Sequence, residues 1–170
     1  MRADWDGHPN GREWSSHVEM ALGISQLPGF VPADVQQFWS GYEAADPAGR
    51  QEFWLMLISA IAKEESNFDP NCEYDEPPPL NQKSLGLMQL SYTDRSYGCD
   101  FPDEQSVKDP RRNLTCAVRI MNRLILRDQR IGGDGAHRTA GAAAYWSTLR
   151  VPRPGKRDPR AYVISRTSVL

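Results

Sequence analysis

The stretch FWLMLISAIAKEESNFDP, residues 53–70, decides the fold of this chain. Residues 53–62 are almost all apolar, and Asn67 and Pro70 interrupt the pattern soon after. Such a run, ended in this way, predicts a buried helix over about residues 48–66. One face of that helix carries apolar side chains at spacings of three and four: Trp54, Leu57, Ile58, Ile61 and Ala62.

Two glutamates stand side by side near the end of this helix. Each residue advances the helix by about 100°, so Glu65 returns to within about 20° of Ile58, whereas Glu64 lies about 120° away. We therefore expect Glu65 to point along the apolar stripe and Glu64 to be a solvated neighbour. Burial raises the pKa of a carboxyl, and an acid that keeps its proton near neutral pH can protonate a leaving oxygen. The alternative is that Glu65 lies at the rim and pairs with a basic side chain.

The rest of the chain predicts a mainly α fold with a small extended or β-hairpin insert. Asp46-Pro47 and Asp109-Pro110 each open a long helix, because aspartate caps a helix and proline fits its first turn. The prolines at 77–79 exclude regular helix from residues 71–83 and leave room for a short hairpin. We also expect short helices over 14–24, 34–43, 84–91 and 139–149, a loop over 92–108 and a short element in the tail.

The length and composition favour one soluble domain. The chain has 170 residues, 39% of them hydrophobic, and a formal net charge of −2. We divide it into an N-terminal helical extension (1–45), a core (46–150) and a basic C-terminal tail (151–170). No apolar run reaches the roughly 18 residues of a membrane-spanning helix, and no basic stripe with aromatics indicates nucleic-acid binding. We expect neither membrane insertion nor a nucleic-acid partner.

Three cysteines leave one unpaired if a disulfide forms. We favour Cys99 with Cys116, because that bond would tie a loop rich in Gly, Asp and Pro to the following helix and would suit an oxidising compartment. The alternative, three reduced cysteines, is as well supported by composition. The spacing of the cysteines and histidines matches no metal motif, so we expect no metal and no cofactor.

Four segments, in order, resemble one family. Glu65-Ser66-x-Phe68-x-Pro70 follows the apolar helix, and SLGLMQL at residues 84–90 comes next. Asp109-Pro110 with Asn113, and then Ala143-Ala144-Tyr145, complete the series. Together, over about residues 55–150, they resemble the lysozyme-like lytic transglycosylases and goose-type muramidases. The resemblance implies a lysozyme-like helical fold, with the insert beside a cleft that binds peptidoglycan strands.

The resemblance also implies roles for individual residues. Glu65 matches the catalytic acid, which is the glutamate that the helical geometry selects. Tyr145 matches a tyrosine near that acid, where its hydroxyl would orient the carboxyl or touch substrate; a buried structural tyrosine is the alternative. The resemblance implies four further substrate-binding residues: Ser66, Gly86, Met88 and Gln89. Ser66 follows the acid and could instead cap the helix. The other three match residues that line the cleft, although Met88 suits core packing better.

The reaction depends on a second carboxylate. Hydrolysis normally uses one as base or nucleophile, whereas a lytic transglycosylase manages with one acid and lets a substrate hydroxyl attack. Asp75 and Glu76 are the first candidates and Glu73 the next, although acidic loop residues are more often solvated. If one of them lies opposite Glu65, we expect a hydrolase.

The expected function is cleavage of the β-1,4 backbone between N-acetylmuramic acid and N-acetylglucosamine. The alternatives are an N-acetylglucosaminidase of the same fold, a phage endolysin, and a lysozyme-like module that binds glycan or protein without catalysis. The first residues lack the features of a secretory signal. We therefore expect an antibacterial effector that resembles type VI secreted peptidoglycan hydrolases, made in the cytoplasm and acting in a target's periplasm. Such effectors are held in check by an immunity protein that occludes the cleft.

Overall fold

The apolar stretch forms the central helix α2 (Pro47–Ser66) in a computed structural model that describes residues 2–170. Every residue from Phe53 to Ala62 is buried. The expected apolar stripe therefore extends around the whole circumference of this part of α2, because other segments pack on all its sides. The position of Glu65 depends on the last turn of this helix.

The ends of the two long helices form as their sequences predict. The Asp46 carboxylate accepts a hydrogen bond from the amide of Gly49 (2.8 Å) at the start of α2. The Asp109 carboxylate accepts one from the amide of Arg112 (2.9 Å) at the start of α3 (Pro110–Asp128). The residues that follow the two helices, Asn67 and Gln129, have left-handed φ angles of 52° and 61°, which end each helix.

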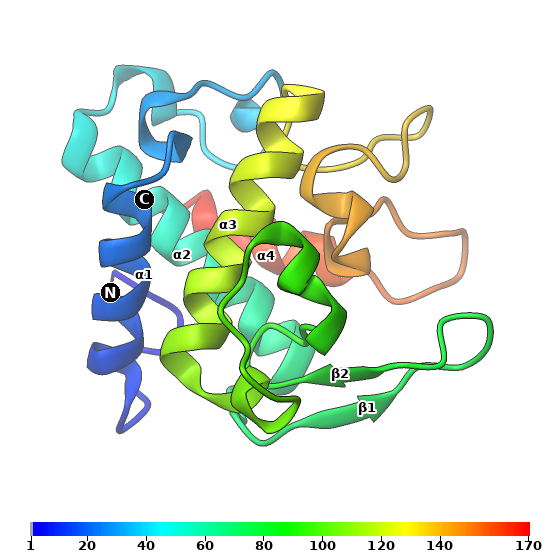
Figure 1. The fold of residues 1–170 in the computed structure, drawn as a ribbon. Helices are drawn as coiled ribbons and strands as arrows, with labels where there is room; N and C mark the ends of the chain where they lie inside the picture. The colour runs from blue at the N-terminus through cyan, green and yellow to red at the C-terminus, as the bar shows by residue number, and fades with distance from the viewer. Residues whose placement is uncertain (1) are drawn as a thin grey trace.

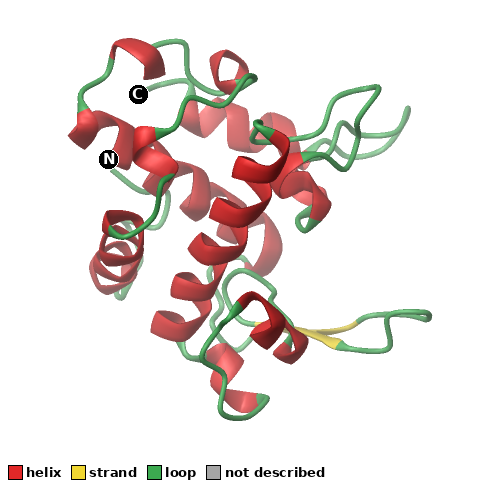
Figure 2. Cartoon of the chain, turned by 45° about the horizontal axis from the view of Figure 1, so that its top comes forward, coloured by secondary structure: helices red, strands yellow, loops and turns green. Residues whose placement is uncertain are grey.

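The other helices pack around this centre (Figure 1). Helix α1 (Gly11–Gly23) lies against α3 and α2, and α4 (Pro159–Thr167) lies against α2. Figure 2 shows that these helices form the body of the molecule, while the β-hairpin and the loops around residues 135 and 155 extend from one side of it. No helix within residues 2–170 is long and apolar enough to cross a membrane.

A two-stranded antiparallel hairpin follows α2. Strands β1 (Glu73–Asp75) and β2 (Lys83–Leu85) pair so that Tyr74 lies opposite Ser84. The expected mainly α fold with a small hairpin insert is thereby confirmed.

Three of the predicted short helices are wrong, and the expected loop over 92–108 contains two 3₁₀ turns. Residues 34–43 and 139–149 form separate 3₁₀ turns, and residues 84–91 form the end of β2 followed by a tight turn. Gly141 explains one case, because its φ is 61° and a Cβ there would lie 2.1 Å from the carbonyl oxygen of Arg130. The 3₁₀ turns cover Leu27–Gly29, Val35–Gln37, Tyr42–Ala44, Tyr92–Tyr97, Gln105–Lys108, Gly141–Ala144 and Ser147–Leu149.

The two terminal regions belong to the same core as the middle of the chain. Trp5 and Trp14 are fully buried and pack edge to face, with ring centroids 5.6 Å apart. In the tail, α4 is joined to the N-terminal segment through Asp4, whose carboxylate accepts hydrogen bonds from Tyr162 (2.6 Å) and Arg166 (2.7 Å). The end of the chain therefore packs on the core, since α4 lies against α2, whereas residues 153–158 are exposed.

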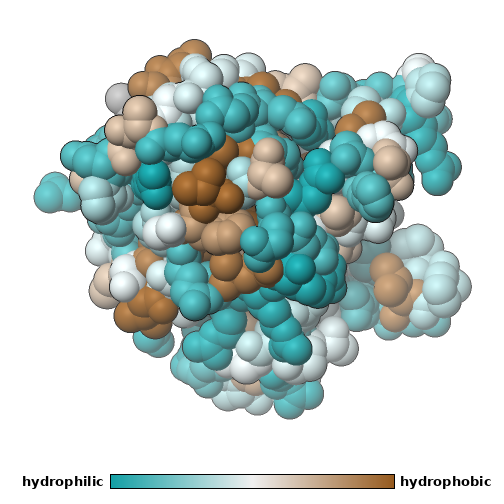
Figure 3. Space-filling view, turned by 90° about the horizontal axis from the view of Figure 1, so that it is seen from above, coloured by the Kyte–Doolittle hydropathy of each residue, from teal (hydrophilic) through white to brown (hydrophobic). Residues whose placement is uncertain are grey.

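A disulfide joins Cys99 to Cys116, the favoured pair, and ties the 92–108 segment to α3. Cys72 is free and partly exposed. The surface seen in Figure 3 is mostly hydrophilic, with apolar side chains in small patches.

Candidate active site

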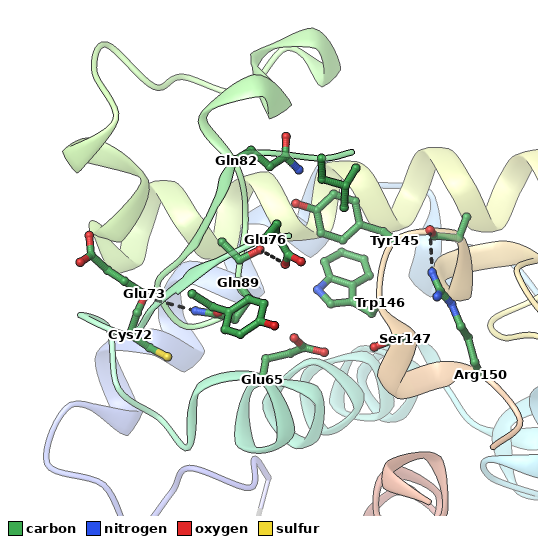
Figure 4. Close-up of a pocket in the computed structure, with 14 residues that line it drawn as sticks. Glu65, Cys72, Glu73, Glu76, Gln82, Gln89, Tyr145, Trp146, Ser147 and Arg150 are labelled. Carbon is green, nitrogen blue, oxygen red and sulfur yellow. Dashed lines mark hydrogen bonds between the residues drawn. The ribbon is translucent and has the colours of Figure 1, made fainter. Parts of the chain in front are cut away.

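A cavity of about 760 Å³ opens between the hairpin and the turns at residues 141–149. Figure 4 shows Cys72 and Glu73 at one end, Arg150 at the other, and Glu65 and Glu76 between them. The lining side chains come from the end of α2, the hairpin and the segment after α3: Glu65, Cys72, Glu73, Tyr74, Glu76, Leu80, Gln82, Ser84, Gln89, Ala144, Tyr145, Trp146, Ser147 and Arg150.

The last turn of α2 carries Glu65 into this cavity. Its Oε1 accepts a hydrogen bond of 2.6 Å from the hydroxyl of Thr148, and within residues 2–170 no basic side chain forms an ion pair with it. Burial raises the pKa of Glu65, and the neighbouring acids add to this effect, while the Thr148 hydrogen bond and the charge of Arg150 oppose it. Glu65 is thus a carboxyl that holds its proton to a higher pH than an exposed glutamate.

The expectation that Glu64 is solvated is wrong. Its side chain is only 6% exposed and forms an ion pair with Arg157. The chain between Arg150 and α4 passes over this flank of α2 and supplies the arginine. Helical phase separates the two glutamates correctly, but it could not reveal that a distant segment covers the second face.

Of the three candidates for a second carboxylate, Glu76 is the best placed. It lines the cavity, and its Oε1 accepts a hydrogen bond of 2.6 Å from the hydroxyl of Ser84 on the opposite strand. Glu73 forms an ion pair of 3.0 Å with Lys108, which lowers the pKa of Glu73. Asp75 is exposed on β1 and does not line the cavity.

The turn after β2 is held from α3. Gly86 has a φ of 76°, and a Cβ there would lie 2.7 Å from Nδ2 of Asn113. That buried amide donates to the carbonyls of Leu85 (3.0 Å) and Val107 (2.8 Å), and its Oδ1 accepts from the amide of Met88 (2.9 Å). Gly86 therefore permits close packing against Asn113 and does not line the cavity itself.

Of the other four predicted binding residues, Gln89 and Tyr145 line the cavity, whereas Met88 and Ser66 do not. Gln89 lines it, and its Nε2 donates to the carbonyls of Gly86 (3.0 Å) and Cys72 (3.2 Å), which fixes its orientation. Met88 is fully buried in the core. The Ser66 hydroxyl donates to the carbonyl of Leu87 (2.9 Å), so it joins α2 to the turn and acts on the cavity only indirectly.

Tyr145 lines the cavity, but its hydroxyl does not orient Glu65. It donates instead to the carboxylate of Asp94, and burial with this acid raises the pKa of Tyr145. Asp94 also accepts from the amide of Ser91 (2.8 Å). The neighbouring Trp146 is 2% exposed and donates from its indole nitrogen to the carbonyl of Met88 (3.0 Å), which joins this segment to the turn after β2.

Sequence reasoning missed three polar residues of this site. Thr148 supplies the hydrogen bond to Glu65, Ser84 the one to Glu76, and Arg150 the positive charge at one end of the cavity. Ser84 lies in the SLGLMQL segment, so its place opposite β1 could have pointed to it. The short polar stretch after Tyr145 carried no comparable pattern.

Comparisons with known proteins agree with this arrangement. The family described as "Transglycosylase SLT domain" matches residues 44–148. Three similar solved structures are all of Bd0314 DslA. A glutamate-to-glutamine mutant is 31% identical, with a TM-score of 0.89 over 98% of this chain and 94% of that chain. The wild-type form 2 (TM-score 0.86) and a second such mutant (0.85) are each 32% identical and cover 96% of this chain and 93% of that chain. No curated protein matches significantly.

Proposed function

This chain belongs to the transglycosylase SLT domain family of peptidoglycan-cleaving enzymes, and we propose that it cuts the β-1,4 bond between N-acetylmuramic acid and N-acetylglucosamine with Glu65 as general acid. The observation that carries this proposal is the setting of Glu65. It reaches the cavity with one neutral hydroxyl as its partner, and burial raises its pKa. Such a carboxyl can give its proton to the glycosidic oxygen as the bond to the leaving sugar breaks.

We propose that Glu76 is the second carboxylate and that the reaction is hydrolysis. Glu76 lines the same cavity, and the Ser84 hydroxyl holds it in place. In addition, the two mutated glutamates of Bd0314 DslA are separated by the same number of residues as Glu65 and Glu76. An ionised Glu76 would take a proton from the attacking water or stabilise the positive charge that develops on the sugar.

The description of the family favours a second candidate, lytic transglycosylation. Glu65 would then protonate the leaving oxygen and afterwards accept the proton of the muramic acid 6-hydroxyl, which closes the anhydro ring. Glu76 would have no chemical step in this reaction. The two candidates share Glu65 and differ in their need for Glu76.

The test is digestion of purified cell walls with mass spectrometry of the products. The native chain, Glu65→Gln and Glu76→Gln are compared, with Asp75→Asn as a matched control from the same hairpin that does not line the cavity. Reducing muramic acid ends with loss of activity in both variants support the hydrolase, whereas anhydro-muramic ends with an active Glu76→Gln support the transglycosylase. Reducing N-acetylglucosamine ends would assign a glucosaminidase. Equal activity in native chain and Glu65→Gln, or binding without cleavage by the native chain, would contradict the proposed role of Glu65.

We further propose that the enzyme is an antibacterial effector that acts in the periplasm of a target bacterium and is inhibited by an immunity protein that occludes the cavity. The Cys99–Cys116 disulfide supports an oxidising site of action. Periplasmic expression in a susceptible bacterium should stop growth with the native chain and not with Glu65→Gln. Unimpaired growth with properly folded native chain would contradict this setting.

A further inference from the structure

The end of the cavity away from the hairpin carries positive charge that carbonyl groups hold in place. Arg150 lines the cavity, and its guanidinium donates to the carbonyls of Ala143 (2.8 Å) and Ala144 (3.3 Å). Arg138, which does not line the cavity itself, lies beside this end and donates from Nε to the carbonyl of Val151 (3.0 Å), the residue after Arg150. Because carbonyls carry no net charge, these bonds orient both guanidinium groups without neutralising them.

Acids on neighbouring segments have other partners. Asp134 forms an ion pair of 2.8 Å with Arg130, and Glu64 pairs with Arg157. Within residues 2–170, neither Arg138 nor Arg150 forms an ion pair with a carboxylate. Two like charges held near each other repel. Burial and then the charge of Arg138 lower the pKa of Arg150, while Glu65 in the same cavity opposes this effect. An anion bound between them would remove this repulsion.

The chemistry of the two side chains specifies the kind of anion. Most guanidinium N–H groups remain after the carbonyl bonds are made, and their planar fork matches the two oxygens of a carboxylate. Glu76, which lies on the hairpin side between the two ends of the cavity, would repel the same group (Figure 4). A substrate that carries carboxylates therefore has one favoured orientation in the cavity.

We propose that Arg138 and Arg150 form a carboxylate-binding subsite for the acidic substituent of muramic acid, either its own lactyl group or the stem peptide attached to it. This inference rests on the proposed function, since it assigns a part of the peptidoglycan strand to a part of the same cavity. The subsite draws the muramic acid substituent toward the 138–151 side, and thereby selects which sugar presents its glycosidic oxygen to Glu65.

Binding to the inactive Glu65→Gln protein separates this subsite from catalysis. Calorimetric titration uses three soluble probes: a peptidoglycan tetrasaccharide with stem peptides, the same tetrasaccharide after amidase removes the peptides, and chitotetraose, which has no carboxylate. Arg138→Gln is added to this background as the main variant. Arg150→Lys is the second variant, because it keeps the charge and loses the fork. Arg153→Gln is the matched control, an exposed arginine three residues after Arg150.

The expected result is roughly ten-fold weaker binding of carboxylate-bearing probes by both variants, the loss typical of one charged hydrogen-bonded contact, with binding of chitotetraose unchanged. Weakening confined to the peptide-bearing probe assigns the subsite to the stem peptide; weakening of the amidase-treated probe assigns it to the lactyl group. Equal weakening of all three probes, an equal effect of Arg153→Gln, or no weakening overturns the subsite. Failure of the proposed function is distinct, because the parent protein would then bind none of the probes and the native chain would leave walls intact.

Discussion

The last turn of α2 has two faces, and each receives one of two adjacent glutamates. On one face Glu64 lies under the chain that leads to α4 and has the charged partner Arg157. On the other, Glu65 reaches the cavity and has the neutral partner Thr148. An ion pair favours the charged form of a carboxyl, whereas burial with a neutral donor favours the protonated form. The identity of the partner, more than the depth of burial, therefore distinguishes the ion-paired glutamate from the proposed catalytic acid.

The largest expected difference between the two faces is in activity. Glu65→Gln should lower wall-digestion rates by about a hundred- to ten-thousand-fold, the range that a general acid contributes. Glu64→Gln keeps the proton donor and should stay within about three-fold of the native rate. Rates on purified walls measure both, and a comparable loss in Glu64→Gln would remove the distinction.

The Arg157 ion pair should matter for stability. Arg157→Ala leaves Glu64 without its partner and should lower the free energy of unfolding by about 1–2 kcal/mol. The effect stays below that of a fully buried pair because the Arg157 side chain is 74% exposed and water can replace it. Urea unfolding measures the change, with Lys156→Ala as the exposed neighbour control. An equal loss in both variants would show that the ion pair contributes nothing particular.

Removing the charge of Glu65 should raise the stability of the fold, in contrast to the loss expected for Arg157→Ala. Because its folded pKa is raised, its contribution to stability is fully present below the unfolded pKa and is lost as the pH rises through the folded value. Glu65→Gln cannot ionise, so it should be more stable than the native chain by roughly 1 kcal/mol at neutral pH. The difference should vanish in acid. Melting temperatures over a pH series test this, and a difference that grows toward acid pH would refute it.

The smallest expected effect concerns Thr148. Its hydrogen bond lowers the pKa of Glu65, so Thr148→Val should raise that pKa further and move the alkaline limb of the pH–rate profile to higher pH. Thr148→Ser keeps the hydroxyl and should restore the native profile. A purely structural role for Thr148 would change the rate in Thr148→Val without moving the limb.

Local sequence patterns predicted the helices that frame the site and the face on which Glu65 lies. These signals are local in the sequence. The caps at Asp46 and Asp109 and the prolines of the insert act on residues only a few positions away, so neighbouring residues are enough to predict their effect. The resemblance to the family extended this to the cavity and to Gln89.

The partners of these residues were not predictable in the same way. Thr148, Arg157 and Asp94 reach Glu65, Glu64 and Tyr145 only after the chain folds back on itself. The tyrosine shows the consequence most clearly, because its hydroxyl goes to Asp94 and a threonine takes the place beside the acid. No periodic pattern in the sequence indicates that Thr148, and not Tyr145, is the hydrogen-bond partner of Glu65.

The single amide of Asn113 gives the two walls of the cavity different mechanical properties. It binds Leu85 at the end of β2, Met88 in the turn that follows and Val107 in the 3₁₀ turn before α3, so the Gln89 side of the cavity is tied to α3. The hairpin wall has only two short strands, and such a ribbon is easily bent. The Ser66 hydroxyl also joins this turn to α2 next to Glu65. We therefore expect the turn to keep its position relative to that acid while the hairpin bends to admit a bulky glycan strand. On this expectation, the placement of the acid and the tolerance for a heterogeneous polymer depend on separate parts of the fold.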